Sequence, residues 1–233
     1  TSYSRLKIEQ TGQKRTETNT DHLITENQSA AVLDPENDLR DEFSEVEENE
    51  ELLIGGGKQM GLVLHDCLEL IDFAPYIGLE YDVLKTQPAV VDVVLRSMST
   101  HNIETGEFEG ILSTLWRTAH AQLSLTDTLT LPPLATLNIR HEMEFLYPFP
   151  FDTPTPEGYI RGFIDGLFEH NGKFYWLDWK SDRLNRYTPE SIRTHVTAHY
   201  QLQAHLYNLA LLKLLRIKNA HDFEKKFGGL IYV

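Results

Sequence analysis

Cysteine is scarce in this sequence: Cys67 is the single cysteine among 233 residues. A lone cysteine cannot form a disulfide within the chain, and it excludes a zinc or iron–sulfur site built from four cysteines. Cysteine-poor chains are typical of reducing compartments. We therefore expect the protein to be cytoplasmic.

A long apolar run is also absent. No stretch approaches the roughly 20 consecutive apolar residues that a membrane-spanning helix needs, and the first residues lack the pattern of a secretory signal peptide. We therefore expect no membrane partner. Because the chain starts at Thr1 and ends inside the apolar run at residues 230–233, we expect both ends to be cuts through a longer protein.

Positive charge is the third scarce feature. The chain has 21 lysines and arginines against 35 aspartates and glutamates, which gives a net charge of −14. Residues 1–60 carry a net charge of −8 and residues 61–233 a net charge of −6, and no basic stripe stands out. Charge alone therefore gives no indication of a nucleic-acid partner.

The N-terminal quarter differs in character from the rest. Residues 8–52 are polar, acidic and poorly periodic, which is typical of a mobile linker. Three consecutive glycines, residues 55–57, follow as a hinge. We expect an acidic, largely flexible tether at residues 1–54 and one folded domain, truncated at its C-terminal end, at residues 55–233.

The most informative stretch surrounds the pair Asn171-Gly172. Two runs rich in β-branched and aromatic residues flank this pair, which is the strongest short-range signal for a hairpin with a two-residue type I′ turn. In such a hairpin Asp165 lies directly across from Asp178, with Cβ atoms roughly 5 Å apart. Lys180 shares the face of Asp178 because side chains on a strand alternate between faces.

Two carboxylates and an ammonium group on one face of a hairpin indicate a metal site. Like charges opposed across a ladder destabilise it, and a hard divalent cation held by carboxylate oxygens would compensate. Lys180 could then hold or activate a water beside the cation. The alternative is structural: Asp165 and Asp178 would lie at strand ends and face water, with Lys180 as an ordinary ion-pair partner.

Periodicity and turn signals outline the other elements. They predict helices at 58–73, from Pro88 onward and at 108–123, a strand at 137–147, a long helix from the N-cap Thr188 to about residue 217 with a break, and a final strand. On the helix from Pro88 we expect Leu95 to be buried. The expected packing side of the long helix consists of Leu202, Leu206, Leu209 and Leu212.

The residues around the hairpin resemble a known family. Gly162-Phe-Ile-Asp165, followed by Leu177-Asp178-Trp179-Lys180-Ser181, resembles the signature of the PD-(D/E)xK nucleases, and more narrowly that of the C-terminal nuclease domains of RecB type, which belong to RecBCD helicase–nucleases (exodeoxyribonuclease V). Gly61-x-x-x-His65 and Gln203-x-x-x-Tyr207 resemble two further motifs of these domains. Several spaced motifs in the right order are more specific than any one of them.

This resemblance implies an α/β fold: a restriction-endonuclease-like mixed central sheet flanked by helices, with extra N-terminal helices. It also implies a metal-dependent exodeoxyribonuclease. The implied catalytic residues are Asp165, Asp178 and Lys180. The implied ligands of Mg²⁺, for which Mn²⁺ or Ca²⁺ can substitute in binding, are His65, Asp165, Asp178 and the carbonyl of Trp179. The residues implied to position DNA and the lysine are Gln203 and Tyr207.

Glu144 lies in the predicted strand ahead of the hairpin and is a further candidate. Its carboxylate could approach the metal through a water molecule, and the alternative is a glutamate that simply faces solvent. The solvent-facing glutamate is the default interpretation.

The resemblance implies partners as well. These are DNA, as a single strand emerging from a helicase, a helicase domain N-terminal to this chain, and other RecBCD-like subunits that act in double-strand-break repair by recombination. A second class of function stays open, namely a catalytically silent nuclease-like module that binds DNA or partner subunits. The intact set of candidate site residues argues against this second class.

Overall fold

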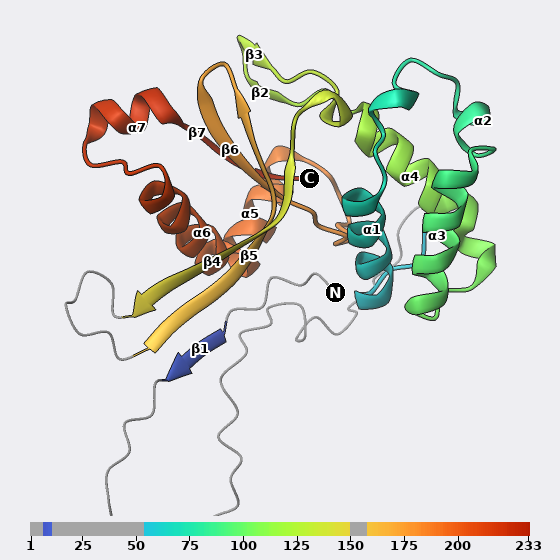
Figure 1. Ribbon diagram of the computed structural model, residues 1–233, viewed down its shortest axis with the longest axis horizontal. Helices are drawn as coiled ribbons and strands as arrows, with labels where there is room; N and C mark the ends of the chain where they lie inside the picture. The colour runs from blue at the N-terminus through green and yellow to red at the C-terminus, as the bar shows by residue number, and fades with distance from the viewer. Residues whose placement is uncertain (1–6, 11–53, 150–157) are drawn as a thin grey trace, which may run out of the picture.

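The computed structural model describes residues 7–10, 54–149 and 158–233. Figure 1 shows the N-terminal helices grouped beside a strongly twisted sheet, with α1 as the helix of that group that faces the strands. Within the described ranges, no helix combines the length and the apolar character that crossing a membrane would require.

The N-terminal group contains the extra helices that the sequence predicts. Its members are α1 (Lys58–Leu70), η2 (Ala74–Tyr76), α2 (Tyr81–Leu84), α3 (Pro88–Thr100), η3 (Thr105–Glu107) and α4 (Phe108–His120). Pro88 is the first residue of α3. Proline has no backbone N–H, but at this position the N–H would have no partner within the helix, so no hydrogen bond is lost. Val90 and Val94, four residues apart on one face, are fully buried in the helical core.

Three details of this group differ from the prediction. The helix predicted at 108–123 ends at His120. The first helix ends at Leu70 and not at residue 73, because the Asp72 carboxylate accepts a hydrogen bond from the backbone N–H of Ala74 at 3.0 Å and favours a turn there. Leu95, expected to be buried, is 41% exposed. The face of α3 that packs on α1 instead presents Ser97, whose hydroxyl donates to Asp66 of α1 at 2.9 Å.

The central sheet is mixed, as predicted. Its strands are β1 (Lys7–Gln10), β4 (Arg140–Phe149), β5 (Gly158–His170), β6 (Lys173–Asp178) and β7 (Phe227–Tyr232). The long strand β5 pairs antiparallel with β1, β4 and β6, and β6 pairs parallel with β7. A small separate hairpin consists of β2 (Ser124–Thr126) and β3 (Leu129–Thr130), followed by η4 (Leu134–Thr136).

The parallel pairing of β6 with β7 requires a crossover, and three helices supply it. They are α5 (Pro189–His199), α6 (Gln201–Leu214) and α7 (Ala220–Lys226). Thr188 caps α5 by accepting a hydrogen bond from the N–H of Ser191 at 3.2 Å, and the predicted break falls at Tyr200. Both features of the long helix are therefore confirmed.

The expected packing side of α6 is wrong in part, because only Leu206 of its four leucines packs against a core cluster. Leu202 is 52% exposed, and the buried positions of the helix are Gln203, Tyr207, Ala210 and Leu211. The Tyr207 ring contacts the rings of Trp176 and Phe145 edge-on, with centroids 5.1 and 5.4 Å away. Aromatic side chains of the sheet therefore centre the packed face of α6 on Tyr207, with Leu206 and Leu211 beside it, and Leu202 is left on the outer side.

Apolar clusters cover the sheet on both faces. One cluster joins the sheet to α6 through Trp176 and Tyr207, and another joins it to the η4 region through Leu134 and Trp179. Part of the expected tether, strand β1, is paired with β5. The rest of that segment, residues 1–6 and 11–53, lies outside the described residues, as do residues 150–157 of the proline-rich loop.

Candidate active site

The turn and register of the central hairpin are as the sequence predicts. Asn171 and Gly172 both have positive φ, 52° and 76°, as a type I′ turn requires. The pairing continues to Gly166 opposite Leu177, so the next pair along the strands is Asp165 with Asp178. Their side chains are 2% and 0% exposed. The alternative in which these carboxylates face water is therefore wrong.

Asp178 ends β6 and is held on both carboxylate oxygens. Gln203 of α6 donates from Nε2 to Oδ1 at 2.9 Å, and Lys180 places Nζ 2.5 Å from Oδ2. The packed face of α6 therefore carries Gln203 to the carboxylate at the end of the strand. The structure thus brings together three of the residues predicted for the site.

The orientation of Lys180 follows from its backbone and from two rings. Its N–H donates to the carbonyl of Val233 at 2.8 Å, which extends the β6–β7 pairing past the end of β6. Its Nζ lies 4.3 Å from the centroid of the Tyr200 ring and 5.9 Å from that of Tyr232. A cation over aromatic faces is stabilised electrostatically, so this ammonium group is fixed beside Asp178.

Asp165 is buried among negative charge. Its Oδ2 accepts a hydrogen bond from the backbone N–H of Trp179 at 2.9 Å. Burial first, and the nearby Asp178 carboxylate second, raise the pKa of Asp165 well above its usual range, although the Trp179 N–H and Lys180 oppose this. A positive ion at this position would favour the ionised form of Asp165.

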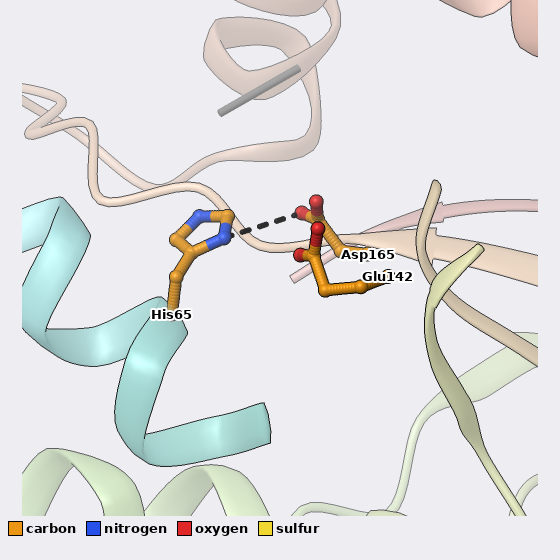
Figure 2. Close-up of side chains that lie close together, drawn as sticks. All are labelled: His65, Glu142 and Asp165. Atoms are coloured by element: carbon orange, nitrogen blue, oxygen red, sulfur yellow. Dashed lines mark ion pairs between the residues drawn. The ribbon is translucent and has the colours of Figure 1, made fainter. Parts of the chain in front are cut away.

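His65 reaches this carboxylate from α1. Its Nε2 lies 3.0 Å from the carbonyl oxygen of Trp179; because a carbonyl can only accept, Nε2 donates its proton there. Burial lowers the pKa of His65, so the ring is neutral and Nδ1 bears a lone pair. That nitrogen lies 3.6 Å from Oδ2 of Asp165. Figure 2 marks this contact with a dashed line.

Gly61 explains why α1 can approach so closely. A Cβ atom at this position would lie 2.8 Å from the hydroxyl oxygen of Ser181, which is below normal contact distance. The glycine of the Gly61-x-x-x-His65 motif therefore allows the helix to pack on the chain that leaves the hairpin. This packing places His65, one turn later on the same face, at the carboxylates.

Glu142 completes the cluster, and sequence reasoning missed it. Ligand atoms of His65, Glu142 and Asp165 all lie within 4.8 Å of one another, and Figure 2 shows the two carboxylates side by side opposite the ring. The β4–β5 pairs on either side place Glu142 across from Asp165. The backbone of Glu142 has φ of 51°, a left-handed conformation that is rare within a strand.

The other candidate on β4 lies outside the site. Glu144 forms an ion pair with Arg161 at 2.6 Å, and both side chains are substantially exposed. No local signal in the sequence distinguishes Glu142 from Glu144, because what separates them is the pairing of β4 with another strand, β5. The acidic residue of β4 at the site is therefore Glu142, and the solvent-facing alternative describes Glu144.

The remaining residues of the predicted set have well-defined positions. Tyr207 is fully buried beneath the site in the α6 interface. The Trp179 carbonyl accepts the His65 hydrogen bond, and its part as a metal ligand stays a prediction. So does the part of Gln203 and Tyr207 in positioning DNA.

The donor set fits a divalent cation. Within the described part of the chain, Nδ1 of His65 and Oδ1 of Asp165 are buried without a hydrogen-bond partner, and buried polar atoms normally have one. Both atoms are lone-pair donors, and a neutral imidazole beside carboxylates suits a divalent metal ion. A cation would satisfy both atoms at once and counteract the burial and the neighbouring Asp178 charge, which together raise the pKa of Asp165.

Comparison with known proteins places the site in a family. Residues 38–232 match the PD-(D/E)XK nuclease superfamily. The chain is 32% identical over 208 residues to the RecBCD enzyme subunit RecB of Escherichia coli strain K12, covering 76% of this chain and 16% of that protein. It is 28% identical over 205 residues to RecB of Haemophilus influenzae, again covering 76% of this chain and 16% of the relative.

RecB of Borreliella burgdorferi is a third relative, 24% identical over 196 residues, which cover 76% of this chain and 17% of that protein. The chain spans only 16% of the length of the E. coli and H. influenzae RecB proteins. The superfamily match nevertheless extends over both motif-bearing helices and the hairpin. The chain therefore belongs to the PD-(D/E)XK nuclease superfamily, as a domain homologous to the nuclease region of RecB.

Proposed function

We propose that this domain is a Mg²⁺-dependent DNA exonuclease that hydrolyses phosphodiester bonds. The observation that supports this most directly is the cluster of ligand atoms at His65, Glu142 and Asp165, with buried lone pairs on the histidine and the aspartate. Such a cluster is unfavourable by itself, because buried acceptors without a donor lose their hydration and gain nothing in return. A bound cation resolves this conflict, and nucleases of this superfamily use one.

Each residue of the site has a defined part in this proposal. Mg²⁺ would be held by the side chains of His65, Glu142, Asp165 and Asp178 and by the carbonyl of Trp179. When bound, the metal polarises a phosphoryl oxygen and stabilises developing charge. Gln203 fixes the Asp178 carboxylate by the hydrogen bond at 2.9 Å, and Tyr207 fixes α6 against the sheet.

Lys180 is the group that faces the reacting water. Its ammonium lies at Asp178 and over the Tyr200 ring, so it is positioned by contacts on two sides. From there it orients the attacking water and adds positive charge near the phosphate. Positioned charges of this kind contribute most in a site that excludes bulk water.

The RecB relationship suggests the wider setting. We infer that the domain is the nuclease part of a larger cytoplasmic helicase–nuclease, in which a motor delivers single strands during recombinational repair of double-strand breaks. Residues 1–54 would then link the motor to the nuclease and residues 55–233 would form the catalytic unit. This setting implies weak, unprocessive digestion by the isolated chain, and vigorous processive digestion would contradict it.

The test compares Asp178→Ala and Lys180→Ala with wild type on labelled single- and double-stranded DNA in Mg²⁺. We expect each variant to lose at least about 100-fold in rate, the scale of a positioned catalytic group. Glu144→Ala is the matched control, because its carboxylate lies on the same sheet outside the site, and it should cleave normally. Undiminished cleavage by Asp178→Ala and Lys180→Ala would exclude the assignment.

Calorimetric titration with Mn²⁺ separates this proposal from a silent nuclease-like module. Binding that is lost in Asp165→Ala and kept in Glu144→Ala supports the metal site. Absence of binding by wild type at millimolar Mn²⁺ would favour the silent module.

A further inference from the structure

The loop that leaves the active site has a charge unlike that of the chain as a whole. Residues 181–193 include the connection from β6 to α5 and the first turn of α5. They contain three arginines, Arg183, Arg186 and Arg193, and two acidic residues. All three arginines are exposed. Among the described residues, none of them forms an ion pair. They therefore present free guanidinium groups immediately after the catalytic Lys180.

An aromatic ring stands out from the same loop. Tyr187 is 68% exposed, the highest value for any large hydrophobic side chain in the described part of the chain. Its hydroxyl does not point away into solvent. It donates to the carbonyl of Asp182 at 3.3 Å and accepts from the N–H of Leu184 at 3.4 Å. The ring is thus anchored at its polar end while most of its surface stays open.

The start of the loop is tied to the active site. The carboxylate of Asp182 accepts a short hydrogen bond from the Tyr200 hydroxyl and lies 3.2 Å from Nε2 of His195. Tyr200 is also the ring beneath the Lys180 ammonium. One buried tyrosine therefore fixes both the catalytic lysine and the loop that displays Tyr187.

From this arrangement we propose that residues 181–193 form the binding surface for single-stranded DNA, with Tyr187 as a stacking platform for a nucleobase and Arg183, Arg186 and Arg193 as phosphate contacts. Single-strand binding proteins combine these two features, because bases stack on aromatic rings and cations follow the backbone. The proposal rests on the proposed nuclease function. It also explains how a chain of net charge −14 can hold a polyanion, since the positive groups lie where the strand must pass.

A second basic region supplies the matched control. Lys218 and Lys225, before and within α7, are exposed and belong to the crossover end of the fold, which Figure 1 places away from α1 and the site. If DNA were attracted only by net charge, neutralising these lysines would weaken binding as much as neutralising Arg186. If the loop is the binding surface, only the loop arginines matter.

The experiment measures binding of a fluorescein-labelled oligothymidine to the whole chain by anisotropy, in EDTA so that cleavage plays no part. Tyr187→Ala should weaken binding about tenfold, within the range for loss of one stacked base. Tyr187→Phe keeps the ring and should retain most of the affinity. Equal losses in both variants would place the effect in the hydroxyl contacts and overturn the stacking platform.

Salt dependence tests the arginines. For a single strand, each lost phosphate contact reduces the slope of log K against log salt by about 0.7. We expect this reduction in Arg186→Ala and no change in Lys225→Ala; equal behaviour of the two would overturn the phosphate contacts. Because these measurements need neither metal nor turnover, failure of the nuclease assignment would appear separately, as normal DNA binding without cleavage.

Discussion

The Nε2 atom of His65 lies 3.0 Å from the carbonyl oxygen of Trp179, and this contact decides which ring nitrogen faces the carboxylates. The carbonyl accepts the proton of Nε2, so the lone pair of the neutral ring is on Nδ1, 3.6 Å from Asp165. A backbone group between Asp178 and Lys180 therefore sets the tautomer of a residue 114 positions away in sequence. Outer hydrogen bonds commonly orient metal-binding histidines in this way.

The first prediction concerns this histidine. His65→Ala removes one ligand without adding charge and should weaken Mn²⁺ binding at least about tenfold. Titration calorimetry measures the change. His205→Ala is the matched control, because His205 is an exposed residue of α6 and should bind Mn²⁺ like wild type. Equal affinity of His65→Ala and wild type would remove His65 from the site.

A second prediction follows from the raised pKa of Asp165, caused mainly by burial and then by Asp178. Between the unfolded and folded pKa values the native state binds more protons than the unfolded chain, so the free energy of unfolding of the metal-free protein falls as pH rises. Asp165→Asn is uncharged at every pH. It should therefore be more stable than wild type at about pH 8, with an advantage that shrinks toward about pH 4.

Urea unfolding in EDTA at a series of pH values measures this difference. Asp92→Asn, at an exposed position of α3, is the control and should show no pH-dependent gain. If wild type is more stable than Asp165→Asn at alkaline pH, the ionised Asp165 carboxylate does not destabilise the metal-free fold, and the prediction is wrong. Saturating Mn²⁺ should reverse the order, because only the carboxylate gains from the cation.

Features set by local chemistry were predictable from the sequence. A two-residue Asn171-Gly172 turn fixes the register of its own strands, so the opposition of Asp165 and Asp178 followed from counting. The cap at Thr188 followed from a similarly local signal, whereas the mixed sheet was implied by the family resemblance. The family motifs then supplied His65, whose position depends on a helix far away in the chain.

Features set by distant contacts were not predictable in this way. The register of β4 on β5 is a pairing between separate segments of the chain, so nothing local shows that Glu142, and not Glu144, reaches the site. The packing face of α6 could not be predicted from the sequence for a related reason. That helix has apolar residues on most sides, and the choice of Tyr207 over Leu202 is made by the aromatic surface of the sheet.

The third prediction uses the unusual backbone of Glu142, which has φ of 51°. Non-glycine residues lose roughly 1–2 kcal/mol in this conformation, whereas glycine adopts it freely. Glu142→Gly should therefore leave stability unchanged or raise it by up to about 1 kcal/mol, while Mn²⁺ affinity falls. Glu144→Gly, at a regular strand position, should instead lower stability by about 1 kcal/mol and leave Mn²⁺ affinity unchanged.

Chemical denaturation and calorimetry on the two glycine variants measure both effects. The exposed ion pair of Glu144 with Arg161 contributes little to either result, since surface pairs are typically weak. A larger loss of stability in Glu142→Gly than in Glu144→Gly would show that the left-handed backbone is not strained. Unaltered Mn²⁺ affinity in Glu142→Gly would remove this residue from the ligand set.

The fourth prediction concerns the Tyr200 ring, whose centroid lies 4.3 Å from the ammonium of Lys180, the proposed catalytic lysine. Tyr200→Leu removes the cation–π contact, worth roughly 1–2 kcal/mol at a buried site, and should lower the single-turnover cleavage rate about tenfold. Tyr200→Phe keeps the ring and loses only the hydrogen bond to Asp182, so its rate should stay closer to wild type. Mn²⁺ affinity should be the same in both, because Tyr200 is outside the proposed ligand set.

The matched control for this last experiment is Tyr232→Leu. The Tyr232 ring centroid lies 5.9 Å from the same ammonium, so its removal should slow cleavage less than removal of the Tyr200 ring. Thermal unfolding of all three variants fixes a temperature at which each is fully folded, so that rate differences reflect the site and not the loss of a buried ring. If Tyr200→Leu and Tyr232→Leu slow cleavage equally, the position of Lys180 depends on general packing around β7 and not on the specific contact with the Tyr200 ring. A selective effect of Tyr200→Leu would instead show that the break between α5 and α6 contributes to cleavage, because Tyr200 lies at this break and its ring contacts the Lys180 ammonium.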